Sequence, residues 1–240
     1  MRVLLLSDIH SNAGALGAVM ESAGDVDAVW CLGDVVGYGP DPNECIAKLR
    51  EIPGLVCLQG NHDAAATGQL ALQGFNSEAR SSIEWLRGCL ETESLTFLQS
   101  LRPRCKTNGV TLVHASPRQP LLEYLLDAYS ASENLSYFDT DFCFVGHTHI
   151  PLIFFFQGRK VSMQVPIHDA KTMLNSRCIA NPGSVGQPRD RDTRAAYAIF
   201  DHEANTLEYA RVSYDIAAVQ ERMRTARLPD RHIQRLAGGW

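Results

Sequence analysis

Acidic, histidine and asparagine side chains directly follow several apolar segments of this sequence. Asp8 comes after the apolar residues 2–6, and Asp34 follows residues 28–32. Ligands of open α/β sheets bind outside the carboxyl ends of the strands, so side chains at these positions are expected to lie together. Carboxylate oxygens and imidazole nitrogens suit divalent ions such as Mn²⁺, Fe, Zn²⁺ or Ni²⁺. The candidate metal ligands placed in this way are Asp8, His10, Asp34, Asn61, His114, His147 and His149.

Two of these groups repeat a spacing of two residues. In an extended segment, side chains at i and i+2 point to the same side, so Asp8 and His10 can face one ion together. His147 and His149 have the same spacing, and each of them can bind one ion. The two oxygens of Asp34 could bridge two ions. The spacing therefore predicts two ligand sets that share Asp34.

His62 follows Asn61 directly and projects differently, so it need not be a ligand. A histidine there can donate a proton to a leaving alkoxide as a general acid, and Asp63 could hold its tautomer. Taken alone, each motif also occurs at ordinary sites: a D-x-H pair on a surface, or a lone His114 in a core. Their occurrence together, in order and each after a hydrophobic strand, favours one shared metal site.

The order of the elements predicts an α/β fold. Buried strands are expected at residues 2–6, 28–32 and 55–58. Helices are expected between them at residues 12–22 and 42–50, from the helical spacing of apolar residues in the first and a proline in the first turn of the second. The first part of the chain is therefore βαβαβ, with short connections.

The second part is expected to contain more hairpins. Helical segments are expected at residues 77–100 (two short helices), 121–137 and 216–227. Strands are expected at residues 104–107, 110–114, 142–145, 152–156, 160–164, 177–180, 195–200 and 206–212. No internal repeat or linker is found. We therefore expect residues 1–240 to form a single domain of two packed sheets with helices on the outer faces, and the tail after about residue 228 to be mobile.

The composition narrows the function classes. The 240 residues carry a formal net charge of −5, which argues against broad nucleic-acid binding, because that usually requires a basic face. No apolar run reaches the roughly 18 residues of a membrane span. The 7 cysteines are odd in number and form no CxxC pair, so neither a disulfide framework nor a thiolate zinc site is expected. A reducing cytoplasm is the expected location.

Taken together, these motifs resemble the calcineurin-like metallophosphoesterase superfamily. The resemblance rests on Asp8-Ile9-His10, Gly33-Asp34, Gly60-Asn61-His62-Asp63, His114 and Gly146-His147-Thr148-His149. It implies a four-layer α/β/β/α sandwich in which two mixed sheets are flanked by helices. The resemblance further implies that His62 is the general acid. It also divides the ligands between two ions. The implied sets are Asp8, His10, Asp34 and His149 for one ion, and Asp34, Asn61, His114 and His147 for the other.

Residues 33–40 and 181–189 resemble a small stand-alone bacterial and archaeal branch of diadenosine tetraphosphate hydrolase-like and phosphodiesterase-like proteins. Ser/Thr protein phosphatases and their relatives carry Asp-Arg-Gly after the Gly-Asp motif, and that arginine binds phosphate. Here the corresponding residues are Gly37-Tyr38-Gly39. Arg189 is a candidate for phosphate binding, because a guanidinium binds phosphate through two hydrogen bonds, or it is an ordinary surface arginine. Tyr38 either lines the pocket or packs its loop.

The resulting hypothesis is hydrolysis of a phosphoester, by a phosphatase or phosphodiesterase, through a hydroxide that two metal ions activate. His62 would protonate the leaving oxygen, and the substrate would be a small phosphoester or a nucleotide. A non-catalytic metal-binding scaffold of the same fold is one alternative. A nuclease is another, and it would need an electropositive track along the surface.

Overall fold

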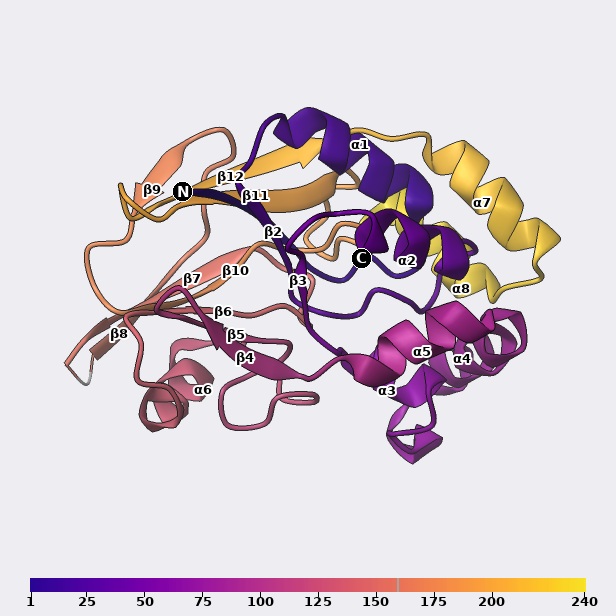
Figure 1. Cartoon of the computed structure of the whole chain (residues 1–240), viewed down its shortest axis with the longest axis horizontal. Helices are drawn as coiled ribbons and strands as arrows, with labels where there is room; N and C mark the ends of the chain where they lie inside the picture. Colours follow the sequence, from indigo (N-terminus) through magenta and orange to yellow (C-terminus); the bar gives the residue numbers. More distant parts are fainter. Residues whose placement is uncertain (159) are drawn as a thin grey trace.

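The computed structural model of the chain describes residues 1–158 and 160–240. Two six-stranded mixed sheets pack face to face, and helices lie on their outer faces and along one end (Figure 1). The expected α/β sandwich of two mixed sheets flanked by helices is confirmed. The turn of the hairpin expected near residue 158 includes position 159, which lies outside the described residues.

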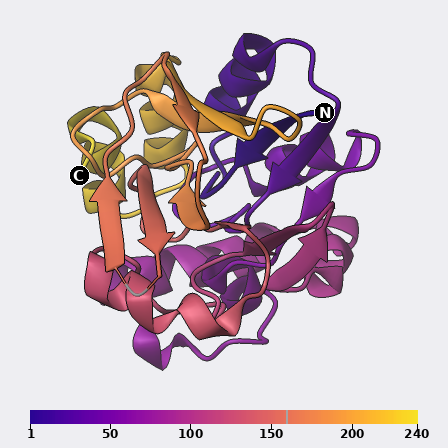
Figure 2. The same ribbon diagram turned by 90° about the vertical axis from the view of Figure 1, so that its left-hand side faces the viewer.

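The first sheet joins the beginning of the chain to its last third, which form the upper half of Figure 2 in indigo and orange. In sheet order its strands are β3 (Val56–Cys57), β2 (Ala28–Cys31), β1 (Arg2–Leu6), β11 (Ala195–Asp201), β12 (Thr206–Val212) and β9 (Lys171–Met173). β1, β2 and β3 run parallel, whereas β11 pairs antiparallel with β1. The carboxyl ends of β1 and β2 therefore meet at one edge.

The second sheet contains the middle of the chain. In sheet order its strands are β4 (Arg104–Thr107), β5 (Val110–Val113), β6 (Phe142–Phe144), β10 (Cys178–Asn181), β7 (Leu152–Gln157) and β8 (Lys160–Gln164). The expected hairpin of β4 and β5 forms as an antiparallel pair. β5, β6 and β10 are parallel neighbours, so their carboxyl ends also share one edge.

The helices follow the sequence signals in most places. Their bounds are α1 (Ala13–Ala23), α2 (Pro42–Arg50), α3 (Asn61–Ala66), α4 (Ser77–Cys89), α5 (Thr92–Ser100), α6 (Ala128–Glu133), α7 (Ile216–Thr225) and α8 (Asp230–Gly238), with 3-10 turns at Leu72–Gly74 and Leu135–Tyr137. The side chains of Asn12, Asn76 and Asp215 cap α1, α4 and α7 by accepting a backbone N–H of the first turn.

The core between the sheets is built from inward-facing aromatic and aliphatic side chains. The rings of Trp30 and Phe200 lie 6.3 Å apart, and that of Phe144 lies 5.0 Å from Phe200, so the rings pack across the interface of the two sheets. α1 covers the outer face of the first sheet with Leu16 and Val19. α6 covers the outer face of the second. This burial holds rigid the strand ends that carry the site.

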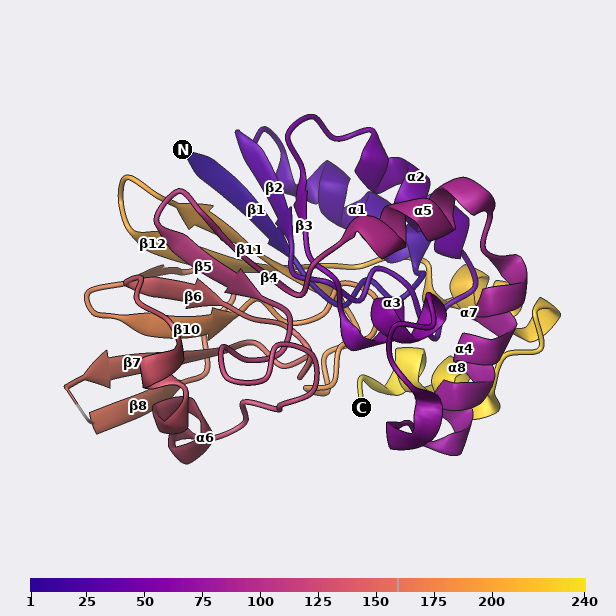
Figure 3. The same cartoon turned by 60° about the horizontal axis from the view of Figure 1, so that its bottom comes forward.

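Two expectations about helices were wrong. The segment expected to be helical over residues 121–137 is irregular before α6, because Glu123 accepts hydrogen bonds from Ser116 and Asn134 instead of facing solvent on a helix. The tail after residue 228, which we expected to be mobile, contains helix α8. α8 lies beside α4 (Figure 3), where Arg231 is 3.9 Å from Glu78, and it packs apolar side chains against α7.

Candidate metal centre

The seven candidate ligands come together beyond the carboxyl ends of β1, β2, β3, β5 and β6, and their side chains are buried. The histidines and carboxylates fall into overlapping groups whose ligand atoms lie within 4.8 Å of one another. Within the described residues these groups are Asp8, His10 and His149; His10, Asp34 and His62; and Asp34, His114 and His147. Asn61 joins the third group, since its Oδ1 lies 3.2 Å from Nε2 of His114.

His10 and His149, both in the first group, face each other with their Nε2 atoms. Nδ1 of His10 lies 3.2 Å from the carbonyl oxygen of Val36, and Nδ1 of His149 lies 2.6 Å from that of Gln187. A carbonyl oxygen only accepts, so each Nδ1 carries the proton, and each neutral ring keeps a lone pair on Nε2. These two Nε2 atoms are 3.0 Å apart. Two lone pairs at this distance repel unless a cation lies beside them, which fits a metal ion.

Asp34 connects the two halves of the centre. Its Oδ2 lies 3.6 Å from Nε2 of His10 and 3.5 Å from Nε2 of His114. Its Oδ1 accepts the backbone N–H of His62 at 2.8 Å, which orients the carboxylate. The carboxylate is thus within reach of both groups, as a bridging ligand requires.

His114 and His147 belong with Asp34 to the third group. Nδ1 of His114 donates to the carbonyl oxygen of Leu32 at 2.8 Å, which leaves Nε2 for a ligand role. Nε2 of His147 is buried and has no hydrogen-bond partner among the described residues. A buried nitrogen without a partner is costly, and a metal ion would satisfy it.

The ionisation of the cluster also fits a cation. Burial lowers the pKa of His114, but the carboxylate of Asp34 outweighs this and brings it to about 9. Burial raises the pKa of Asp8 to about 7, although the charge of His114 opposes it. Burial lowers the pKa of His10 and of His149 well below the usual value. His10 and His149 are therefore neutral, the state in which an imidazole binds a metal, whereas His114 would release a proton when an ion binds.

Five candidate ligands have a left-handed backbone. The φ angles of Asp8, His10, Asp34, His147 and His149 lie between 49° and 67°. Residues other than glycine seldom adopt this conformation, and such strain persists where surrounding contacts impose it, often at functional sites. The expectation that Asp8 and His10 face the same side because their segment is extended was therefore wrong. They meet because both residues turn in the left-handed region after the strand has ended.

A loop that follows β10 holds the two turns of the centre together. Nδ2 of Asn181 donates to the carbonyl oxygen of Gly146 at 2.7 Å and to Oγ1 of Thr148 at 3.0 Å. Oγ of Ser184 donates to the carbonyl oxygen of Asp8 at 2.8 Å. The sequence Asn-Pro-Gly-Ser therefore fixes the backbone of both ligand turns without contributing a ligand.

His62 lies in the first turn of α3 and belongs to the second group, with His10 and Asp34. Its ring centroid is 4.4 Å from that of Tyr38 and 4.9 Å from that of His10, and its Nδ1 has no hydrogen-bond partner among the described residues. A Cβ at Gly37 would lie only 2.8 Å from this Nδ1, and the φ of Gly37 is +118°. The loop after Asp34 therefore requires glycine at position 37, where the related phosphatases carry the aspartate of Asp-Arg-Gly.

Asp63 does not hold the ring of His62, contrary to our expectation. Its carboxylate accepts the backbone N–H groups of Val36 at 3.0 Å, Val35 at 3.3 Å and Gly60 at 2.9 Å. It therefore ties the loop after β2 to the start of α3. Burial, together with the charge of Asp34, raises the pKa of Asp63 to about 7.

Residues 1–205 match the calcineurin-like phosphoesterase superfamily domain. The chain belongs to this family. A metallophosphoesterase from Sphaerobacter thermophilus is 44% identical, with a TM-score of 0.92 over 100% of this chain and 99% of that one. The protein MJ0912 of Methanocaldococcus jannaschii is 37% identical over 237 residues, which are 95% of this chain and 94% of MJ0912. The present protein is accordingly a metallophosphoesterase.

A more distant relative shares the fold. The protein PH1004 of Pyrococcus horikoshii is 20% identical and superimposes with a TM-score of 0.80 over 100% of this chain and 98% of that one. The helices in the described part of the metallophosphoesterase are each too short or too polar to cross a bilayer.

Two arginines lie at the edge of the metal centre. Nη2 of Arg189 donates to Oε1 of Gln187 at 3.0 Å and lies 3.5 Å from the hydroxyl of Tyr38. Nη1 of Arg235, on α8, donates to the same Oε1 at 3.3 Å. The buried Nε atoms of both arginines have no partner among the described residues. Burial and the nearby Arg189 lower the pKa of Arg235.

Sequence analysis identified Arg189 and Tyr38 but missed the contribution of α8. The ring of His232 lies against that of Tyr38, with centroids 4.5 Å apart and planes tilted by 52°, and Arg235 lies about one turn further along the helix. A helical signal was present, because Ile233 and Leu236 are three residues apart and follow Pro229. The sequence does not indicate that this helix packs beside the metal centre.

Proposed function

We propose that this metallophosphoesterase hydrolyses a small phosphoester with two divalent ions, of Mn²⁺, Fe, Zn²⁺ or Ni²⁺, at the ends of the two sheets. These ions suit a ligand set of nitrogen and oxygen donors without sulfur. Each ion takes four of the side chains described above, and Asp34 serves both. The proposed sets are Asp8, His10, Asp34 and His149 for the first ion, and Asp34, Asn61, His114 and His147 for the second.

The position of Asp34 is the observation that carries this proposal. One of its oxygens lies within 3.6 Å of Nε2 of His10 and within 3.5 Å of Nε2 of His114. The Nδ1 atoms of both histidines contact backbone carbonyl oxygens, so both Nε2 atoms are turned to Asp34. Nε2 of His114 would release its proton when an ion binds. This arrangement supports two ions that share one carboxylate rather than a single ion.

His62 is proposed as the general acid. Two bound divalent ions would polarise the phosphoryl oxygens and activate water for attack on phosphorus. Burial lowers the pKa of His62 to about 4, so the free ring is neutral near pH 7. The negative charge of a phosphate beside the ring raises this pKa and favours the protonated form that donates to the leaving oxygen.

Arg189 is proposed to bind the phosphate, together with Arg235. The two guanidinium groups share the neutral Oε1 of Gln187, which leaves positive charge for an anion. Tyr38 keeps Arg189 in place, since the arginine Cζ lies 5.8 Å from the centre of its ring. Arg189, from the loop after β10, would thus supply the positive charge that related phosphatases take from the arginine after Gly-Asp.

The test combines metal analysis with hydrolysis of p-nitrophenyl phosphate and bis(p-nitrophenyl) phosphate in the presence of each candidate ion. We expect about two ions per chain and metal-dependent turnover. Asp34→Asn should lose both metal and turnover. His62→Asn should keep the metal and lose turnover by roughly 100- to 10,000-fold, the range of general acid catalysis. The control is His202→Asn, a histidine at the end of β11 whose ring contacts the carbonyl of Asn108.

The alternatives give different results. A metal-binding scaffold would bind ions but hydrolyse neither ester, and single-ion occupancy would contradict the bridge. Loss of metal in His62→Asn would make His62 a ligand rather than the acid. A nuclease would bind DNA or RNA with a steep dependence on salt concentration.

A further inference from the structure

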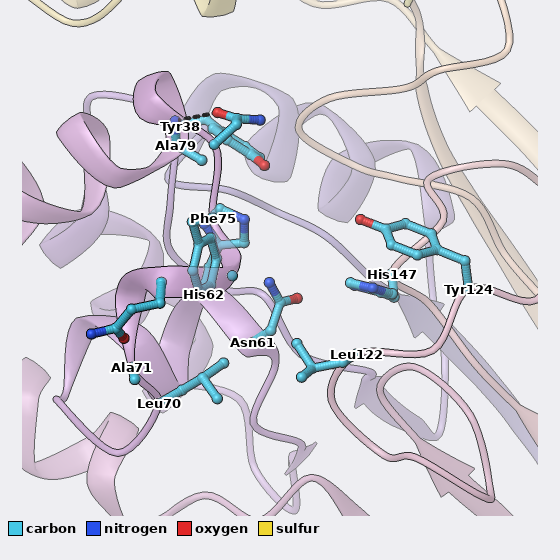
Figure 4. Close-up of a pocket in the computed structure, with 13 residues that line it drawn as sticks. Tyr38, Asn61, His62, Leu70, Ala71, Phe75, Ala79, Leu122, Tyr124 and His147 are labelled. Atoms are coloured by element: carbon cyan, nitrogen blue, oxygen red, sulfur yellow. Dashed lines mark hydrogen bonds between the residues drawn. The ribbon is translucent and has the colours of Figure 1, made fainter.

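A cavity opens directly beside the metal centre on the side of His62, Asn61 and His147. Figure 4 shows residues that line it. Its volume is about 480 Å³, within the usual range of small-molecule sites, roughly 300 to 1,000 Å³. The three residues named belong to the centre itself and form the inner end of the cavity. A ligand in this space would therefore touch the group that is hydrolysed.

The outer walls of the cavity are mainly apolar, and their polar side chains, Gln73 and Asn76, are uncharged. The apolar walls are formed by Leu70 and Phe75 from the region between α3 and α4, and by Leu122 and Tyr124 from the irregular segment before α6. None of the described residues that line the cavity is an aspartate, glutamate, lysine or arginine. Such walls favour a neutral organic group and disfavour a second phosphate, which would lose its hydration without gaining a charged partner.

Aromatic rings stand on both sides of the space. The ring of Tyr124 lies 4.1 Å from that of His147 at 33°, and the ring of Phe75 meets that of His62 edge-on at 5.2 Å. Figure 4 shows Tyr124 and His147 on one side, with Phe75 and His62 on the other. Tyr124 is 50% exposed and Leu122 is 52% exposed. These apolar side chains in contact with solvent would be covered by a flat ring bound between them.

The charges around the centre orient the substrate. Arg189 and Arg235 do not line the cavity, whereas His62 does. The unesterified phosphate oxygens are drawn to the arginines, so the organic group points towards the cavity. Because His62 protonates the oxygen that leaves, the group beside His62 is the leaving alcohol.

We propose that the cavity binds the leaving group, and that this group is a neutral alcohol carrying a flat aromatic ring, as in benzyl or nucleoside 5′-phosphate esters. The inference rests on the proposed function. Water adds to phosphorus, the bond to the ester oxygen breaks, and this oxygen takes a proton from His62. The proton that the water gives up restores the ring. The products are inorganic phosphate, or a monoester if the substrate is a diester, and the free alcohol.

The test compares esters of primary alcohols with and without a ring. Adenosine 5′-phosphate and benzyl phosphate carry a ring, and ribose 5-phosphate lacks one. In the metal-loaded wild type we expect kcat/KM to be at least tenfold higher for each ring-bearing ester, since burying an aromatic ring contributes more than a factor of ten. If only benzyl phosphate is preferred, the site takes small aryl groups; if only adenosine 5′-phosphate is preferred, it takes nucleosides.

Leu122→Asp places a charge in the wall and should lower the ratio of ring-bearing to ring-free kcat/KM roughly tenfold. Leu126→Asp is the matched control, because Leu126 is 47% exposed in the same segment but does not line the cavity. It should leave the ratio unchanged. If the ratio of ring-bearing to ring-free kcat/KM is the same in the wild type and in Leu122→Asp while both hydrolyse the esters, the inference is overturned. The proposed function would still stand.

A second measurement does not depend on turnover. Saturation-transfer NMR with adenosine should show binding to the wild type and to Leu126→Asp but not to Leu122→Asp. If no ester is hydrolysed, the proposed function fails, and this measurement still decides whether the cavity binds an aromatic alcohol. Absence of adenosine binding together with equal kcat/KM values for all three esters would overturn the inference.

Discussion

The Nε2 atoms of His10 and His149 lie 3.0 Å apart, although the two residues are 139 positions apart in the sequence. Each ring is held by a contact from Nδ1 to a backbone carbonyl, of Val36 or Gln187. The lone pairs therefore converge on one point beside Asp8, whose Oδ1 is 3.4 Å from Nε2 of His149. This convergence is favourable only around a cation, so the folded chain is preorganised for a metal ion.

The first prediction concerns the separate loss of the two ions. His149→Ala removes a ligand of only one proposed set, so we expect the metal content to fall from about two ions per chain to about one. His114→Ala should have the same effect through the other set, and Asp34→Ala should release both. Metal analysis by mass spectrometry after gel filtration gives the count. Equal loss of both ions in His149→Ala would show that the two sites are not separable.

The second prediction concerns the loop after Asp34. A Cβ at Gly37 would lie 2.8 Å from Nδ1 of His62 and 2.9 Å from Nδ1 of His10. Gly37→Ala should therefore displace these rings and lower kcat/KM by at least tenfold, since a shift of about 1 Å can cost about 100-fold. Gly17→Ala is the control, because a Cβ at Gly17 of α1 meets nothing within 4 Å. It should leave kcat/KM unchanged and raise the free energy of unfolding by about 0.5–1 kcal/mol.

The third prediction concerns Arg235. Arg235→Ala should lower kcat/KM roughly 10- to 100-fold, because a hydrogen bond to a charged group contributes about 1.5–3 kcal/mol. Arg231→Ala is the control on the same helix, since Arg231 is paired with Glu78 and lies over the ring of Trp240. Steady-state kinetics with p-nitrophenyl phosphate measures both variants. Similar kinetics for the two variants would exclude a phosphate contact from α8.

The fourth prediction concerns the pH dependence of stability through His232. Burial lowers the pKa of this histidine from 6.5 to about 4. Between these values the unfolded chain binds a proton that the folded chain does not, so this contribution is present above pH 6.5 and lost as the pH falls towards 4. From pH 7 to pH 5, the loss attributable to His232 is about 2 kcal/mol. His232→Leu should show a decline smaller by that amount in urea unfolding; parallel declines would contradict the prediction.

The fold was predictable where a local signal and the packing agree. The hairpin of β4 and β5 follows from Asn108-Gly109, and α2 begins at Pro42 as expected. The same reasoning failed for residues 121–127, where hydrogen bonds of Glu123 to residues on either side replace a helix. It also failed for α8, because the apolar face of that helix is short and is stabilised by contacts with α7 rather than by its own sequence.

The sequence by itself identified the candidate residues of the metal centre, because carboxylates and histidines after apolar strands have few other uses when they occur together. Tertiary structure alone decided how these residues meet. Asp8 and His10 converge through left-handed backbone that no local pattern indicates, and Asp63 bonds the backbone rather than His62. The position of Arg235 and the cavity beside His62 depend on segments brought together from distant parts of the chain. Contacts of this kind arise from the packing of sheets and helices, so they become visible only once the chain is folded.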